Sequence, residues 1–66
     1  MHFVYPNLAE VMKSKGMGYK DVAVILNIGE FAAYRRLRGI VGWRLPEVFR
    51  LSEYFDSDPA WLFKRL

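Results

Sequence analysis

A run in the middle of the chain, residues 19–39, constrains the fold more than any other feature. It reads YKDVAVILNIGEFAAYRRLRG, which divides into two stretches with the apolar spacing of short helices. Asn27 lies between them, where a tight turn needs a positive φ and Asn is the best tolerated residue after Gly. The apolar positions that would lock the two helices together are Val22, Ala23, Leu26, Ile28, Ala33 and Leu37. The run therefore predicts a helix-turn-helix unit whose second helix leaves one face free.

The free face of the second helix is predicted to be basic. Four arginines and no acid lie between Ala32 and Leu45, namely Arg35, Arg36, Arg38 and Arg44. A basic helix face of this kind can enter the major groove of DNA, although a solvated charged surface is the alternative interpretation. The net charge of +3 and the pI near 9.5 are too mild to indicate nucleic acid by themselves.

The size and composition predict a single domain over residues 1–66, near the lower limit for independent folding. The chain has no cysteine and one histidine, so we expect neither a disulfide nor a metal site, and no cofactor. Hydrophobic residues make up 53% of the chain, which supplies a core and leaves apolar surface for a partner. A homodimer is the simplest such partner. No apolar stretch reaches the roughly 20 residues of a membrane helix, so we expect no membrane association.

Gly and Pro signals divide the chain into five expected helices and an N-terminal arm of residues 1–6. Gly16 and Gly39 suit the left-handed stop of a helix, and Asp58 followed by Pro59 is a strong helix start. The expected helices are residues 7–15, 19–26, 30–38, 46–55 and a short final one from 59. The prediction is a compact all-α domain. Its arm either packs on the first helix or crosses to a second subunit, and His2 in the arm is expected to be solvated.

The chain resembles the lambda-repressor/Cro-type helix-turn-helix proteins, in particular the small phage-encoded regulators with five helices. The matching stretches are NLAEVMKSKGM, KDVAVILNIGEFAAYRRLRG and LPEVFRLSEYFDSDPAWLF, within about Asn7–Phe63. The resemblance implies a five-helix lambda-repressor-like fold, a double-stranded DNA operator as ligand and a dimer on a two-fold site. It also implies the cytoplasm of a bacterium or of a phage-infected host cell.

The resemblance also assigns candidate base contacts to the second helix of the unit. Glu30, Phe31 and Arg35 match positions that usually meet base edges, and Tyr34 lies on the same helix. Arg35 is the strongest candidate, because a guanidinium can bond two acceptors of guanine. Glu30 can accept from a cytosine amino group, or it serves only the helix dipole. Phe31 contacts a thymine methyl, the core or a protein partner, and Tyr34 is left between a phosphate and the edge of the core.

A second group of residues is expected to contact DNA phosphates. Tyr19 and Arg38 match backbone-contacting positions of the resembled family, and nearby cations can neutralise phosphates in the same way. The candidates are Tyr19, Lys20, Arg36, Arg38 and Arg44. For Arg36 the alternative is that its stem covers apolar surface.

The chain departs from the resembled pattern at several positions. Gly18 and Gly29 stand where hydroxyl residues would cap the two helices, and Ala33 is smaller than the branched residue expected there. Arg36 occupies a position that is often aromatic. Phe31 and Tyr34, by contrast, are aromatic at positions where polar residues are common. These departures affect the identity of the base contacts more than the fold.

The remaining aromatic residues have alternative roles. Trp43 is expected to cover the core rather than to stack on a base. Trp61 and Phe63 serve either a dimer contact or the core.

Two functions from different classes remain. The first is a sequence-specific transcription regulator of the phage Cro/repressor type, and the second is a helix-turn-helix protein–protein interaction module, antirepressor-like or an assembly factor, that binds no DNA. An enzyme is not expected, because the serines lack a basic partner at a plausible spacing. No small-molecule substrate is expected either.

Overall fold

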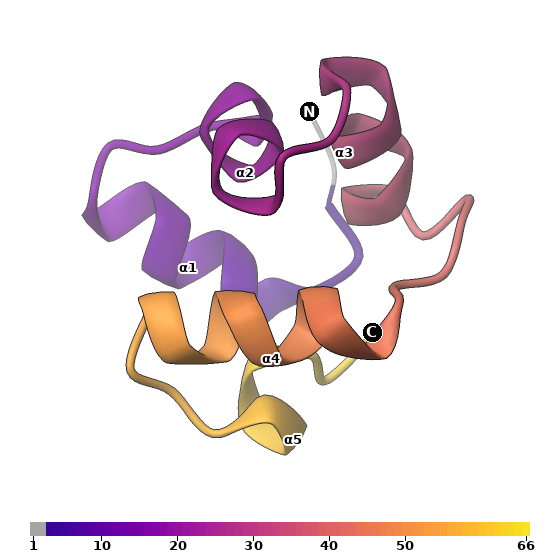
Figure 1. Cartoon of the computed structure of the whole chain (residues 1–66). Helices are drawn as coiled ribbons and strands as arrows, with labels where there is room; N and C mark the ends of the chain where they lie inside the picture. Colours follow the sequence, from indigo (N-terminus) through magenta and orange to yellow (C-terminus); the bar gives the residue numbers. More distant parts are fainter. Residues whose placement is uncertain (1–2) are drawn as a thin grey trace.

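A computed structural model describes residues 3–66, and every regular element in that range is a helix. The helices are α1 (Pro6–Ser14), α2 (Tyr19–Leu26), α3 (Glu30–Leu37), α4 (Leu45–Tyr54) and α5 (Pro59–Leu62). They wrap around one core, with α2 and α3 on one side and α4 and α5 on the other (Figure 1). The predicted all-α class is confirmed. The expectation for His2 lies outside the described residues.

The predicted helix signals act at the observed boundaries. Gly16 and Gly39 have φ values of +65° and +75°, the left-handed conformation expected after a helix. The carboxylate of Asp58 accepts a hydrogen bond from the backbone N–H of Trp61 at 3.1 Å and so caps α5. The observed bounds of α1, α3 and α4 differ from the expected ones by a single residue at each shifted end, which is ordinary fraying of helix termini.

The turn between α2 and α3 has the expected left-handed residue. Asn27 lies at φ 55° and ψ 48°, and the next N–H, that of Ile28, donates to the carbonyl of Ala23 at 3.0 Å. At the other end of α2, the N–H of Gly18 donates to the carboxylate of Asp21 at 2.8 Å. Asp21 therefore makes one half of a capping box, and glycine at position 18 has no side chain to accept the N–H of Asp21 in return.

The inner faces of α2 and α3 form the centre of the core. Five of the six residues expected to join these helices are buried, and Ile28 is half-buried against them. The buried five are Val22, Ala23, Leu26, Ala33 and Leu37. Since Ala23 and Ala33 are small, the two backbones can approach closely, and Leu37 is fully covered by the rest of the domain.

The N-terminal arm packs on its own chain. The N–H of Val4 donates to the carbonyl of Leu37 at 3.1 Å, and the carbonyl of Val4 accepts from the N–H of Leu66 at 3.0 Å. Val4 of the arm thus lies between the C-terminal end of α3 and Leu66. The arm also contacts the first helix, as expected, because the carbonyl of Tyr5 accepts the N–H of Ala9 at 2.9 Å.

An aromatic cluster that includes Tyr5 of the arm covers part of the core. The Trp43 ring is half-buried and makes edge-to-face contacts with Tyr5 at 5.9 Å and with Phe63 at 5.2 Å between ring centroids. Trp43 therefore has the covering role expected of it. Trp61, by contrast, remains 48% exposed, so it is not a core residue.

Candidate nucleic-acid interface

The outer face of α3 presents a continuous set of polar and aromatic side chains. Ala33 and Leu37 are directed into the core, whereas five exposed or partly exposed side chains follow one another from the first turn of the helix to its end. These residues are Glu30, Phe31, Tyr34, Arg35 and Arg38. All four candidate base contacts and one candidate phosphate contact thus share one surface, which we call the α3 face.

The arginines of the α3 face are held against aromatic rings. The guanidinium of Arg35 lies 5.5 Å from the centroid of the Phe31 ring. Arg38 lies 5.7 Å from the Tyr34 ring and donates a hydrogen bond of 2.9 Å to its hydroxyl. The Tyr34 ring in turn meets the Tyr19 ring of α2 edge-to-face at 5.5 Å. These contacts orient two cations on the exposed side of the helix.

A shallow hollow lies beside these arginines at the N-terminal end of α3. It has a volume of about 370 Å³ and is lined by Tyr19, Glu30, Phe31 and Tyr34. Phe31 is 70% exposed, which is unusual for a phenylalanine in a small domain. We call this feature the aromatic hollow.

Arg36 is placed differently from the other arginines of α3. Its Nε donates to Oε1 of Glu47 at 2.8 Å, and both side chains are only 11% exposed. The same Glu47 oxygen accepts the backbone N–H of Arg44 at 2.9 Å, which fixes the start of α4. The prediction that Arg36 contacts phosphate is therefore not supported, because its guanidinium joins α3 to α4 inside the domain.

Sequence reasoning overlooked Glu47, which is buried. Two features of the sequence could have indicated that Arg36 and Glu47 form a pair inside the domain. Glu47 is the third residue of α4, where a glutamate commonly bonds the N-cap backbone. Arg36 also stands at a position that is often aromatic in the resembled family, so a side chain covering the core was a reasonable expectation.

A family model matches residues 2–66, almost the whole chain, and its description is BetR domain. The chain belongs to the BetR domain family. This family is a small helical, helix-turn-helix-like domain of the DNA-binding type. No curated protein and no solved structure matches the chain.

The remaining candidate phosphate contacts of this BetR domain come from α2, from the end of α3 and from the loop before α4. Lys20 on α2 and Arg44 before α4 are exposed, as is Arg38 at the end of α3. Tyr19, at the first position of α2, is half-buried by its contact with Tyr34. Their contacts with phosphate stay predictions.

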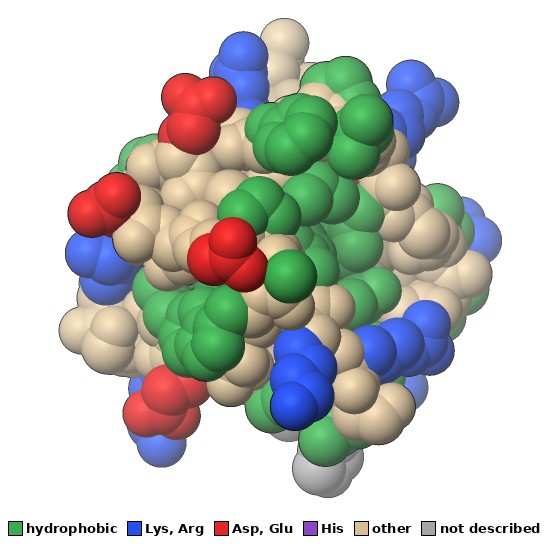
Figure 2. Space-filling model, turned by 90° about the horizontal axis from the view of Figure 1, so that it is seen from below, with side chains coloured by type: hydrophobic (Ala, Val, Ile, Leu, Met, Phe, Trp, Pro, Cys, Tyr) green, Lys and Arg blue, Asp and Glu red, His purple; other side chains and the backbone are tan. Residues whose placement is uncertain are grey.

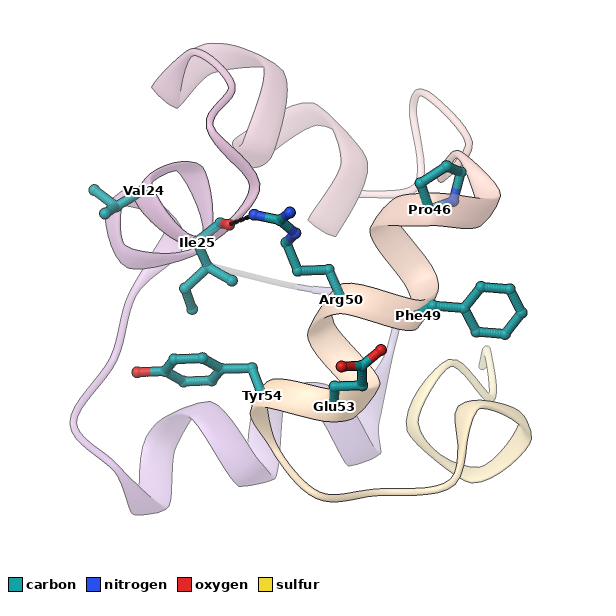
Figure 3. Close-up of a pocket in the computed structure, with 7 residues that line it drawn as sticks. All are labelled: Val24, Ile25, Pro46, Phe49, Arg50, Glu53 and Tyr54. Carbon is teal, nitrogen blue, oxygen red and sulfur yellow. Dashed lines mark hydrogen bonds between the residues drawn. The ribbon is translucent and has the colours of Figure 1, made fainter.

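A second exposed surface of the BetR domain is a groove between α2 and α4, with a volume of about 840 Å³ (Figure 3). Its lining residues are Val24, Ile25, Pro46, Phe49, Arg50, Glu53 and Tyr54. Arg50 reaches from α4 to α2 and donates to the carbonyl of Ile25 at 3.3 Å, whereas Val24 and Tyr54 are 81% and 54% exposed. We call this surface the α2–α4 groove.

The side of the domain formed by α4 and α5 also carries apolar surface. Seen from below in Figure 2, hydrophobic side chains gather over the middle of this side, with acidic and basic side chains around them. Phe49 and Trp61 on these helices are each about half exposed. Apolar surface is thus exposed on this side of the domain as well as at Phe31 of the α3 face.

Two further features are absent from residues 3–66 of this BetR domain. None of the helices there is long and apolar enough to span a bilayer. Within the same residues, no three His, Cys, Asp or Glu side chains gather in a way that would hold a metal ion.

Proposed function

We propose that this BetR domain is a sequence-specific double-stranded DNA-binding protein that inserts α3 into the major groove and regulates transcription from an operator. The observation that carries the proposal is the division of α3 into two faces. Ala33 and Leu37 anchor the helix in the core, while Arg35 and Arg38 are held outward on aromatic rings. A rigidly mounted helix with oriented cations is what groove reading requires.

Each cation of the α3 face then has a defined task. Arg35 bonds O6 and N7 of a guanine and so carries sequence information. Arg38, together with Lys20, Arg44 and Tyr19, contacts phosphates and fixes the position of the domain on the duplex. The function is binding, with no catalytic step.

We further propose that the domain acts as a homodimer in the cytoplasm. Two copies of α3 about 34 Å apart would fill successive major grooves and exclude polymerase from the site. The α2–α4 groove supports a contact between copies, since it combines exposed apolar side chains with Arg50 and Glu53 on one helix. A two-fold axis across α4 would bring each of these charges close to the opposite charge of the other copy.

The experiment is selection of bound duplexes from a random pool at low salt, with the wild-type protein and an Arg35→Ala, Arg38→Ala double variant. Enrichment of a palindrome with half-sites about 10 bp apart, lost in the double variant, is the expected result. Retention without enrichment would leave only non-specific backbone binding.

One observation favours a second function. Phe31 exposes 70% of its surface on the very face that would meet DNA, which suits a helix that binds another protein. If no duplex is retained even at low salt, the DNA-binding proposal fails and this interaction-module function takes its place.

A further inference from the structure

We infer that the aromatic hollow recognises a cytosine that carries a methyl group at C5. The inference rests on the proposed DNA-binding function and names the base that this part of α3 reads. The hollow combines one carboxylate, that of Glu30, with the rings of Tyr19, Phe31 and Tyr34. The carboxylate selects the amino group at C4 of the base, and the rings select the methyl group at C5.

The carboxylate of Glu30 selects the amino group of cytosine. Glu30 is exposed in the first turn of α3, and no cation within residues 3–66 forms an ion pair with it. An ionised carboxylate only accepts hydrogen bonds. In the major groove cytosine offers the N4 amino donor, whereas thymine offers the O4 acceptor and guanine offers two acceptors, which a carboxylate repels. Adenine presents its amino donor next to the N7 acceptor, which repels a carboxylate, so adenine is also disfavoured.

The rings of the hollow select the methyl group. C5 is next to C4 on the pyrimidine ring, so a methyl at C5 lies beside the amino group on the same groove edge. Phe31 is 70% exposed and lines the hollow together with Glu30, so it can cover that methyl while the carboxylate holds the amino group. An unmethylated cytosine would satisfy Glu30 and leave the exposed part of the Phe31 ring uncovered.

A carboxylate among aromatic rings also suits a methylated ammonium, as on a modified lysine. The arginines of the α3 face decide against this ligand. Arg35 already lies 5.5 Å from the Phe31 ring and Arg38 lies 5.7 Å from the Tyr34 ring, so a further cation would meet like charge. A methyl group on a neutral base meets no such repulsion.

The test compares two random duplex pools that differ only in containing cytosine or 5-methylcytosine. The wild-type protein is expected to retain the methylated pool about three- to tenfold more tightly, as for the burial of one methyl group. Phe31→Ala should lose this methyl effect and still bind DNA. Glu30→Gln should keep a response to methyl groups and lose the preference for cytosine among the enriched sequences, because an amide also donates. Lys13 is an exposed cation on α1, so Lys13→Ala is the control and should change neither the response to methylation nor the preference for cytosine.

The outcomes separate this inference from the proposed function. Equal retention of the two pools overturns the inference and leaves DNA binding intact. A response to replacing thymine with uracil, without a response to cytosine methylation, also overturns it, because Phe31 would then cover a thymine. No retention of either pool overturns both proposals, and binding of a trimethyl-lysine peptide in its place would assign the hollow to a protein. Thermal melts of the variants show whether each one remains folded.

Discussion

The α3 face and the α2–α4 groove are both exposed, but their side chains are held in different ways. On the α3 face, Arg35 and Arg38 lie on aromatic rings, and Arg38 also donates to the hydroxyl of Tyr34. In the groove, Val24 and Tyr54 are 81% and 54% exposed. One surface consists of oriented cations and rings, and the other of apolar side chains with little cover beside the charged Arg50 and Glu53.

This difference indicates what each surface gains from a partner. Side chains that are already oriented lose less conformational entropy on binding, which favours specific hydrogen bonds to a ligand. Exposed apolar side chains gain chiefly by leaving water, which favours association with another apolar surface. We therefore expect recognition at the α3 face and self-association at the groove, and four variants test this difference.

The largest effect is expected from Arg36→Ala, on the stability of the domain. Arg36 lies on α3 but outside the α3 face, so this variant tests the contact that holds α3 to α4. Removing Arg36 leaves the buried carboxylate of Glu47 without its cation. The free energy of unfolding should fall by about 2–4 kcal/mol, a large part of the stability of so small a domain. Urea denaturation followed by circular dichroism measures it.

Arg38→Ala is the matched control for that measurement, because Arg38 is exposed at the end of the same helix. Its unfolding free energy should change by no more than about 0.5 kcal/mol. Equal losses in the two variants would mean that the Arg36–Glu47 pair does not hold α3 to α4.

The fold could be predicted from sequence because its signals are local. Helix positions follow from apolar spacing, and Asn27, Gly16 and Gly39 take the left-handed conformation that such turn positions require. Among residues 3–66, Asp56 at φ 49° also adopts a left-handed conformation, and the sequence did not predict it. The position carries neither glycine nor asparagine, the residue types that indicate a positive φ. Local patterns thus locate a turn only when its residue type reveals the conformation.

The site was less predictable because it depends on side-chain direction. Arg35, Arg36 and Arg38 are alike in sequence, yet only Arg36 is turned toward α4, where Glu47 lies on another helix. The aromatic hollow likewise requires Tyr19 of α2 to lie beside Tyr34 of α3. Such contacts arise from the packing of two helices, so they cannot be predicted from the spacing of residues along one helix.

Arg35→Ala should produce the next largest effect, on DNA binding alone. Loss of a bidentate contact to guanine is expected to cost about 1–3 kcal/mol and to relax specificity at one base pair. Fluorescence anisotropy with the selected duplex and its single-base variants measures both quantities. If the variant weakens every duplex to the same degree, Arg35 reads no base.

Val24→Lys tests the other side of the comparison. Val24 is 81% exposed, so the change should leave the fold intact while adding a charge to the groove. The dissociation constant of the homodimer should rise at least about tenfold, which corresponds to about 1.4 kcal/mol. Analytical ultracentrifugation measures it without DNA. Leu66→Lys, at a residue 87% exposed outside the groove, is the control. An unchanged constant for Val24→Lys would place the dimer contact elsewhere.

The smallest effect is expected from the charge of Arg38 on the salt dependence of binding. If Arg38 neutralises one phosphate, Arg38→Ala should lower the slope of log affinity against log salt by about 0.9. Arg38→Lys separates charge from geometry, because lysine keeps the cation and loses the planar group that lies on Tyr34. Its slope should match the wild type even if its affinity falls, and Lys13→Ala on α1 should leave the slope unchanged. A slope lowered in both Arg38 variants would show that the contact depends on orientation by Tyr34, so the arrangement of the α3 face would matter more than its charge.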